Sequence, residues 1–353
     1  MRMPDIDIRE NVALAPLTTL GVGGNARFFV KASSVAEVER AVVFARDRRL
    51  ELFVLGGGSN LVVSDRGFDG LVLQIAIDGV EESRQRDRVR FDVGAGVGWD
   101  EFVALSIAGG CGGVECLSGI PGSVGGTPVQ NVGAYGQEVS ETIVSVPAYD
   151  LMERRVLELT KSDCGFAYRS SIFNSSQRGR YIILRVRYEL QLGAEPKLSY
   201  ADLQKHFAGR SGKPTLAEVL GAVFETRAAK GMVINPGDPD SRSAGSFFKN
   251  PVLSAEEFQR LSQIAAEREV RVPSYPALSQ QSKVSAAWLV ENSGFHKGYQ
   301  KGAVAISSKH ALAIVNRGGA TAAGVIALRD EIQAKVEEMW GVKLQPEPVF
   351  VGF

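Results

Sequence analysis

Histidine and cysteine are both scarce in this chain of 353 residues, which has three of each. The cysteines, Cys111, Cys116 and Cys164, are odd in number and lack the spacing of metal ligands. A disulfide-stabilised scaffold and a zinc site built from cysteine and histidine are therefore both disfavoured. We expect no metal.

The chain also lacks net charge and long apolar runs. Forty Lys and Arg residues balance forty Asp and Glu residues, so no positive field draws the protein to a nucleic acid. No apolar run approaches the roughly 18 residues of a membrane span. The first ten residues carry charges where a signal peptide has its apolar stretch. We expect a cytoplasmic globular protein without membrane insertion.

The length predicts two domains and leaves room for a third. Apolar periodicity and capping boxes indicate an α+β chain, with a domain boundary near 215–230. From about 90 to 190 we expect short strands and glycine-rich turns. We expect helices over 33–49, 284–292 and 321–340, and two more that begin at Thr215 and Ser254. The expected strands cover 52–55, 61–63, 71–77, 181–190, 303–306 and 311–315.

Glycine is the one residue in excess, with 39 residues or about 11%, against about 7% on average. One cluster, Gly56-Gly-Gly-Ser-Asn60, directly follows an apolar strand. Consecutive glycines allow backbone N–H groups to approach an anion closely. Neither a Walker A motif nor a G-x-G-x-x-G sequence that opens a helix is present. A simple tight turn therefore remains an equal alternative to a phosphate-binding loop.

The second cluster runs from Gly119 to Gly136 and is long, poor in charge and rich in glycine. Loops that only connect strands are usually shorter. The density of backbone amides suits an extended ligand with phosphates and carbonyls, although a structural loop remains an alternative. Small polar donors stand along it at Ser123, Thr127, Gln130 and Asn131.

Ser246 lies in the segment Ser243–Pro251, between Gly245 and two phenylalanines. No G-x-S-x-G elbow surrounds it, so a role as acylating nucleophile is the weaker hypothesis. A positioned hydroxyl that donates a proton needs no triad. Considered alone, a buried structural serine is the favoured interpretation.

Arg169 and Glu347 are the remaining candidates. Arg169 follows Tyr168 and could bind a carboxylate with two parallel hydrogen bonds. Pro346 and Pro348 hold Glu347 in an extended backbone, which is one way to aim a carboxylate. A surface ion pair and a terminal strand would look the same in the sequence.

In this order, these segments resemble the UDP-N-acetylenolpyruvoylglucosamine reductase family, specifically its type I branch with a tyrosine loop. The resemblance covers essentially the whole chain. The segments that carry it are Thr19–Gly21, Gly56–Asn60, Gly119–Gly136, Tyr168–Phe173, Gly245–Pro251, Trp288–Asn292 and Pro346–Pro348.

The resemblance implies an α+β fold with an FAD-binding part of the vanillyl-alcohol-oxidase type and a C-terminal α/β substrate-binding domain. It places the first FAD-binding subdomain at 1–78, joined by 342–353. The second subdomain would span 79–214 and the substrate-binding domain 215–341.

The resemblance further implies a non-covalent FAD and NADPH as co-substrate. Non-covalent binding agrees with the lack of His and Cys in both glycine-rich loops. The implied FAD contacts are Gly56, Gly57, Gly58, Ser59, Asn60, Gly126, Thr127, Val129, Val132, Gly133, Ala134, Tyr135 and Arg227.

The implied activity is that of an oxidoreductase of peptidoglycan precursor synthesis, which reduces the enolpyruvyl double bond to give UDP-N-acetylmuramate. Hydride passes from NADPH to FAD and then to C3 of the substrate. By resemblance, Ser246 protonates C2, while Arg169 and Glu347 polarise the carboxylate and stabilise the enol-like intermediate. Preorganised donors and cations lower such a barrier.

The implied substrate contacts are Tyr200 of the tyrosine loop, Lys230, Asn250, Tyr275 and His310. The chain departs from the family pattern at two places. The stretch 231–242 is longer, and His310 stands where some members carry glutamine.

Two other functions stay open at this stage. An FAD-dependent oxidase of the same fold class would share both glycine-rich loops but would not need Ser246, Arg169 and Glu347 together. A non-enzymatic regulator that binds UDP-sugars would use the same residue types, and the purified protein would be colourless.

Overall fold

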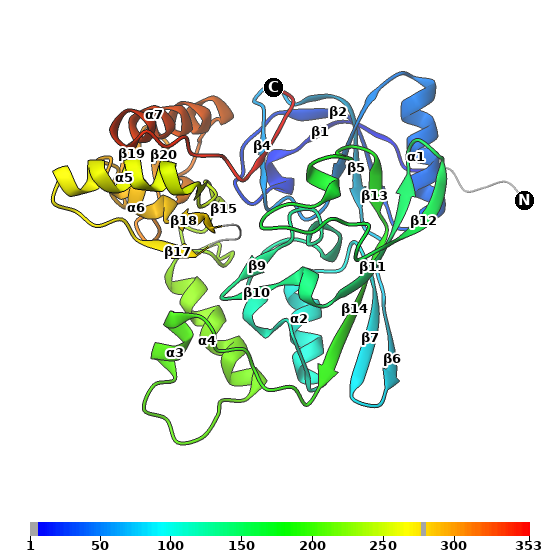
Figure 1. Ribbon diagram of the computed structural model, residues 1–353. Coiled ribbons are helices and arrows are strands. Elements are labelled where there is room, and N and C mark those ends of the chain that lie inside the picture. Colours follow the sequence, from blue (N-terminus) through cyan, green and yellow to red (C-terminus); the bar gives the residue numbers. More distant parts are fainter. Residues whose placement is uncertain (1–5, 277–279) are drawn as a thin grey trace, which may run out of the picture. The chain divides into compact units, whose positions relative to one another are not determined.

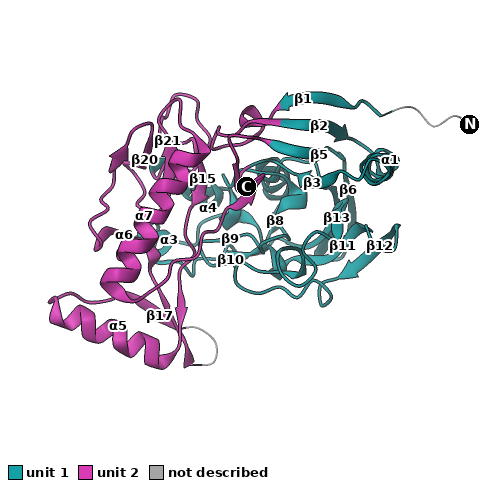
Figure 2. Ribbon diagram, turned by 90° about the horizontal axis from the view of Figure 1, so that it is seen from above, with its two compact units in different colours: residues 1–12, 26–58, 68–229 teal, residues 13–25, 59–67, 230–353 magenta. Residues whose placement is uncertain are grey.

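The computed structural model describes residues 6–276 and 280–353 (Figure 1). Residues 1–5, part of the stretch that argues against a signal peptide, lie outside the described residues. The chain divides into two compact units (Figure 2). Unit 1 comprises residues 1–12, 26–58 and 68–229, and unit 2 comprises residues 13–25, 59–67 and 230–353. Among the described helices, none combines the length and the apolar character that crossing a membrane requires.

The first sheet of unit 1 has the order β1-β2-β5-β3, and both β2 and β3 run parallel to β5. Helix α1 (Val35–Asp47) packs against it, as the sequence predicts. Ser34 caps this helix by accepting a hydrogen bond from the Glu37 amide, and the Glu37 carboxylate accepts from the Ser33 amide. The strands are β1 (Arg9–Ala13), β2 (Asn25–Ala32), β3 (Glu51–Leu55) and β5 (Phe68–Ile75).

The second sheet of unit 1 has the order β12-β11-β14-β7-β6, with β13 beside β11 and β8 beside β14. The strand expected over 181–190 is interrupted at the buried Leu184 and forms two strands, both of which pair with β11, while the second also pairs with β7. The strands are β6 (Val80–Gln85), β7 (Arg88–Gly94), β8 (Cys111–Gly112), β11 (Ile143–Asp150), β12 (Arg155–Thr160), β13 (Tyr181–Ile183) and β14 (Arg185–Leu192).

Helix α2 (Trp99–Ala108) lies in the region for which we expected only short strands and turns, so that prediction is wrong there. The glycines that precede it suggested a turn, but Gly98 is the N-cap residue of this helix. Trp99 and Phe102 anchor it by packing on the buried ring of Tyr188 in β14. The helix thereby joins the core of unit 1.

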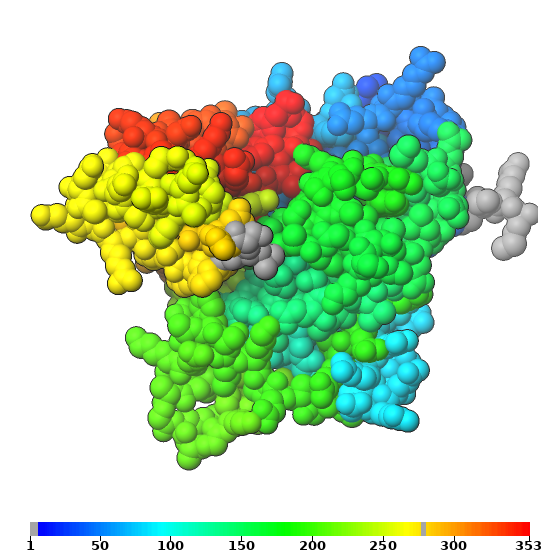
Figure 3. Space-filling model, in the orientation of Figure 1, coloured from blue at the N-terminus to red at the C-terminus, as the bar shows by residue number. Residues whose placement is uncertain are grey.

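Helices α3 (Ala201–His206) and α4 (Leu216–Ala229) complete unit 1 and pack on each other. Their segment forms part of the molecular surface in the space-filling view (Figure 3). The predicted cap of α4 is confirmed, since Thr215 and Glu218 exchange hydrogen bonds. Helix α4 belongs to unit 1, and the last segment of unit 2 begins at Lys230. The finer division into domains at 1–78, 79–214 and 215–341 stays a prediction.

Unit 2 contains an antiparallel sheet with the order β15-β21-β20-β19 and a smaller sheet with the order β16-β18-β17. Strand β22 (Val349–Val351) pairs in parallel with β4 (Leu61–Val63). The larger sheet comprises β15 (Ser243–Ser246), β19 (Gln300–Lys301), β20 (Val304–Ile306) and β21 (Ala313–Asn316), and the smaller one β16 (Val252–Leu253), β17 (Ser274–Pro276) and β18 (Ser282–Val284).

Helices α5 (Ala255–Glu267), α6 (Ala286–Glu291) and α7 (Ala322–Trp340) bury one apolar face each in the core of unit 2. The predicted capping box of Ser254 and Glu257 is confirmed. Thr321 caps α7, and Gly341 ends it with a φ of 65°, a left-handed conformation that suits glycine. Helices α6 and α7 therefore begin and end close to where the sequence predicts, and α5 begins where its capping box predicts.

Candidate active site

The two glycine-rich loops of unit 1 touch each other through their backbones. A Cβ atom on Gly57 would lie 2.6 Å from the Cα atom of Gly122, and one on Gly56 would lie 3.0 Å from the Ser123 hydroxyl. Asp100 in the first turn of α2 accepts hydrogen bonds from the Gly119 amide and the Ser118 hydroxyl. The glycines thus allow a close approach that no larger residue permits.

Ser123 at this junction is only 7% exposed, and its hydroxyl has no hydrogen-bond partner among the described residues. A buried hydroxyl without a partner is costly, and an unfilled ligand position is one explanation for it. The Thr127 hydroxyl differs, since it lies 2.8 Å from both the Val124 carbonyl oxygen and the Tyr188 hydroxyl. Ser123 is therefore the hydroxyl that a polar ligand can engage.

Asn131 and Tyr135 of the adjoining turn, and Arg169 of a separate turn that contacts it, adopt left-handed backbone conformations with φ between 44° and 51°. Such conformations cost energy for non-glycine residues and gather at functional sites. The Arg169 guanidinium donates to the Gly133 carbonyl oxygen at 2.5 Å. Arg169 is therefore held against the loop that contains the predicted FAD contacts Val132–Tyr135.

Arg227 and Tyr200 also lie near this loop in unit 1. Arg227 in α4 is only 9% exposed, and this burial lowers its pKa, while nearby Tyr135 and Asp100 act in the opposite direction. The Tyr135 and Tyr200 rings meet edge to face, with centroids 5.2 Å apart. The loop before α3 is thereby joined to the same turn.

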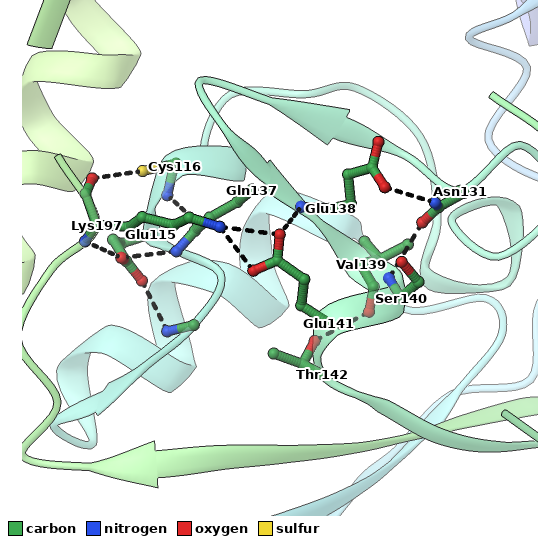
Figure 4. Close-up of polar contacts among 11 residues, drawn as sticks. Glu115, Cys116, Asn131, Gln137, Glu138, Val139, Ser140, Glu141, Thr142 and Lys197 are labelled. Atoms are coloured by element: carbon green, nitrogen blue, oxygen red, sulfur yellow. Dashed lines mark hydrogen bonds and ion pairs between the residues drawn. The ribbon is translucent and has the colours of Figure 1, made fainter. Parts of the chain in front are cut away.

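A buried carboxylate fastens the chain just before Tyr200 (Figure 4). Glu115 is 1% exposed and accepts hydrogen bonds from the Gln137 side chain at 2.7 Å and the Lys197 amide at 2.9 Å, as well as from the Gly113 amide. The Cys116 thiol donates to the Lys197 carbonyl oxygen, and burial raises its pKa to about 12. This network holds the chain at Lys197, three residues before Tyr200.

We expect Glu115→Gln to lower the free energy of unfolding by about 1–3 kcal/mol, because an amide cannot accept all three hydrogen bonds. Lys197→Met is the matched control. It removes the exposed ion pair between Lys197 and Glu141 but leaves the Lys197 amide in place, so it should cost about 0–1 kcal/mol. Urea denaturation measures both values, and equal small losses would contradict the proposed importance of Glu115.

Ser246 lies at the end of strand β15 in unit 2. The pairing of β15 with β21 shifts register between Ser243 and Ser246, and Gly245 has a φ of 78°. A bulge of this kind redirects the next side chain. The Ser246 hydroxyl lies 3.1 Å from Nε2 of His310. The sequence does not indicate this contact, because the two residues are 64 positions apart.

The Glu347 segment lies beside Ser246 in unit 2. The Glu347 amide donates to the Phe247 carbonyl oxygen at 2.9 Å, and its own carbonyl oxygen accepts from the Asn60 side chain at 3.2 Å. Phe248 and Pro346 form an isolated bridge. The structure therefore brings together two of the three predicted catalytic residues, while Arg169 belongs to unit 1.

The remaining predicted contacts have different surroundings. The Asn250 side chain accepts from the Ala286 amide at the start of α6, so it also has a structural role. Tyr275 in β17 is 58% exposed, and Lys230 is the first residue of the last stretch of unit 2. The predicted FAD contacts in unit 1 are Gly56, Gly57, Gly58, Gly126, Thr127, Val129, Val132, Gly133, Ala134, Tyr135 and Arg227, whereas Ser59 and Asn60 belong to unit 2.

Comparison with known proteins supports these assignments of fold. The family profile described as FAD binding domain matches residues 26–153, and the profile of the C-terminal domain of UDP-N-acetylenolpyruvoylglucosamine reductase matches residues 238–351. The expected α+β fold, with an FAD-binding part and a separate C-terminal domain, is confirmed.

Relatives align along almost the whole chain. A UDP-N-acetylenolpyruvoylglucosamine reductase of Thermobifida fusca is 48% identical over 97% of this chain and 98% of its own, and one of Streptomyces coelicolor is 46% identical over 97% and 90%. The crystal structure of the Thermus caldophilus enzyme matches with a TM-score of 0.63 at 26% identity, over 98% and 99% of the two chains. The chain therefore belongs to the UDP-N-acetylenolpyruvoylglucosamine reductase family.

Proposed function

We propose that this protein is an FAD-containing oxidoreductase that uses NADPH to reduce UDP-N-acetylenolpyruvoylglucosamine to UDP-N-acetylmuramate. Near full-length identity of 44–48% to proteins named as this reductase supports the proposal. The structural observation that supports it most is the buried Ser123 hydroxyl, which has no hydrogen-bond partner among the described residues and lies where the two glycine-rich loops meet. An oxidase of the same fold class and a UDP-sugar-binding regulator are not favoured.

The residues of unit 1 fit a dinucleotide cofactor. The closely packed glycine backbones and the Ser123 hydroxyl are proposed to face the phosphate oxygens, and the turn Val132–Tyr135 is proposed to contact the flavin ring. Arg227 adds a buried cation on the same unit. The chemistry that FAD supplies when bound is hydride transfer, from NADPH in one half of the cycle and to the enolpyruvyl group in the other.

The chain's own residues orient the substrate and move a proton. Ser246 donates the proton from Oγ to C2 of the enolpyruvyl group as hydride arrives at C3. Arg169 and Glu347 act on the substrate carboxylate, where negative charge develops, and a preorganised cation lowers the energy of that charge. Tyr200, Lys230, Asn250, Tyr275 and His310 are proposed to surround the UDP-sugar.

Anaerobic absorption spectroscopy tests the proposal. We expect flavin bands in the purified protein that bleach with NADPH and return when UDP-N-acetylenolpyruvoylglucosamine is added. The product should be UDP-N-acetylmuramate, identified by mass spectrometry as a gain of two hydrogens. Recovery of the bands only on admission of air would indicate the oxidase. A protein without flavin after reconstitution with FAD would overturn the assignment.

A further inference from the structure

We propose that His310 positions Ser246 and resupplies the proton that Ser246 gives to the substrate. The inference rests on the proposed function and goes beyond the substrate contact expected of His310. Its starting point is the 3.1 Å separation between His310 Nε2 and Ser246 Oγ. A serine that protonates carbon becomes an alkoxide, which must regain a proton before the next turnover. His310 is the group in contact that can deliver it.

Several hydrogen bonds hold His310 in place. It lies in the turn between β20 and β21, where the Ser307 hydroxyl accepts from the amides of Lys309 and His310 at 3.0 and 3.2 Å. The Ala313 amide donates to the His310 carbonyl oxygen at 3.1 Å, and Ala313 is also the strand partner of Ser246. The hydroxyl therefore lies on β15, and the imidazole lies in the turn that leads into β21, the strand paired with β15.

The Asp240 carboxylate, which lies outside the turn in the sequence, also hydrogen-bonds the turn that contains His310. This carboxylate is 3% exposed, accepts from the Ser308 amide at 3.1 Å and from the Ser308 hydroxyl at 2.5 Å, and pairs with Arg317 at 2.6 Å. Lys309 pairs with Asp238 at 2.6 Å. Both of these carboxylates therefore have a cationic partner, and the backbone amide of Glu347 bonds Phe247, the residue after Ser246.

The direction of the hydrogen bond decides the chemistry. If Nε2 donates, the Ser246 hydroxyl hydrogen is free to point at the substrate, and the N–H group stabilises the oxyanion as it forms. As Ser246 passes its proton to C2, the imidazolium of His310 returns one to Oγ in the same step, so the rate of flavin reoxidation depends on both transfers. His310 then regains a proton from solvent. The cycle consumes NADPH and one proton, which balances the two hydrogens gained by the substrate.

Rapid-mixing measurements on the FAD-loaded protein test this role. Reoxidation of the reduced flavin by substrate should slow by about 10²-fold in His310→Ala, the scale of positioned proton transfer. In His310→Gln an amide can still donate to Ser246, so part of the rate should return. Flavin reduction by NADPH should be unchanged in both variants. His296→Gln is the matched control, because His296 hydrogen-bonds the Lys297 carbonyl oxygen through Nδ1 and packs its ring edge to face on Tyr299.

The pH profile distinguishes proton supply from a merely structural contact. In the native protein the reoxidation rate should fall about tenfold per pH unit above the pKa of the imidazolium, and in His310→Gln this limb should be absent. Retention of the same limb in His310→Gln, or a native rate in His310→Ala, would overturn the inference. Either result would leave the proposed function intact, because the proposed function fails only if the substrate does not reoxidise the flavin of the native protein.

A second readout does not depend on activity. Only three histidines are present, so nitrogen-15 NMR of the ring atoms gives few signals, and His310→Gln identifies the one that belongs to His310. We expect Nε2 of His310 to be protonated and its shift to change in Ser246→Ala. A shift typical of an unprotonated, accepting Nε2 would mean that the serine donates to the histidine, and would contradict the proposal.

Discussion

Ser246→Ala should slow reoxidation of the reduced flavin by UDP-N-acetylenolpyruvoylglucosamine by about 10²-fold or more. The reduction of FAD by NADPH should remain nearly native, because that half of the cycle needs no proton at carbon. Ser246 ends a strand whose bulge at Gly245 aims the hydroxyl, and its contact with His310 does not involve the core. The substitution should therefore leave stability almost unchanged.

The two half-reactions are measured separately by anaerobic rapid mixing. Ser262→Ala is the matched control, since it removes a hydroxyl that bonds the Phe258 carbonyl oxygen within α5 of the same unit. Its two rates should equal those of the native protein. Equal slowing of both half-reactions in Ser246→Ala would remove the role of proton donor. Native reoxidation in that variant would make Ser246 a structural residue.

Local signals in the sequence predicted much of the fold. The box of Ser254 and Glu257 marks the start of α5, and Gly341 marks the end of α7, because caps depend on neighbouring residues alone. Helix α2 was missed because its N-cap is a glycine that follows two others. The interruption of the strand 181–190 at Leu184 was missed because it depends on pairing with the distant strands β11 and β7.

The candidate site was predicted in composition but not in its contacts. The resemblance named Ser246 and His310 separately, and only the pairing of β15 with β21 brings them within 3.1 Å. Ser123 and Thr127 look equivalent in the sequence, yet the Thr127 hydroxyl hydrogen-bonds Tyr188 of β14, while the Ser123 hydroxyl has no partner among the described residues. The role of Glu115 rests on the distant Lys197 amide. Such long-range contacts leave no pattern in a single sequence.

Gly57→Ala should weaken the binding of FAD. The added Cβ would lie 2.6 Å from Gly122 Cα and 2.8 Å from the Ser123 amide nitrogen, and both are backbone atoms that no side-chain rotation can move. The two loops must separate, at a cost of about 1–3 kcal/mol, and the Ser123 hydroxyl moves with them. An affinity for FAD weakened by about tenfold or more corresponds to this cost.

Gly221→Ala is the control for Gly57→Ala, because it makes the same chemical change in helix α4 of the same unit, where the new Cβ would meet open space. Alanine in a helix interior should stabilise the protein by about 0.5–1 kcal/mol, and flavin should be retained. Absorbance at the flavin bands, titration with FAD and thermal unfolding measure these effects. Native affinity for FAD in Gly57→Ala would show that the contact between the two glycine-rich loops does not form the cofactor site. If Gly57→Ala loses flavin but keeps the native unfolding temperature, the substitution affects only the binding of FAD, because the two loops would then have separated without lowering the stability of the fold.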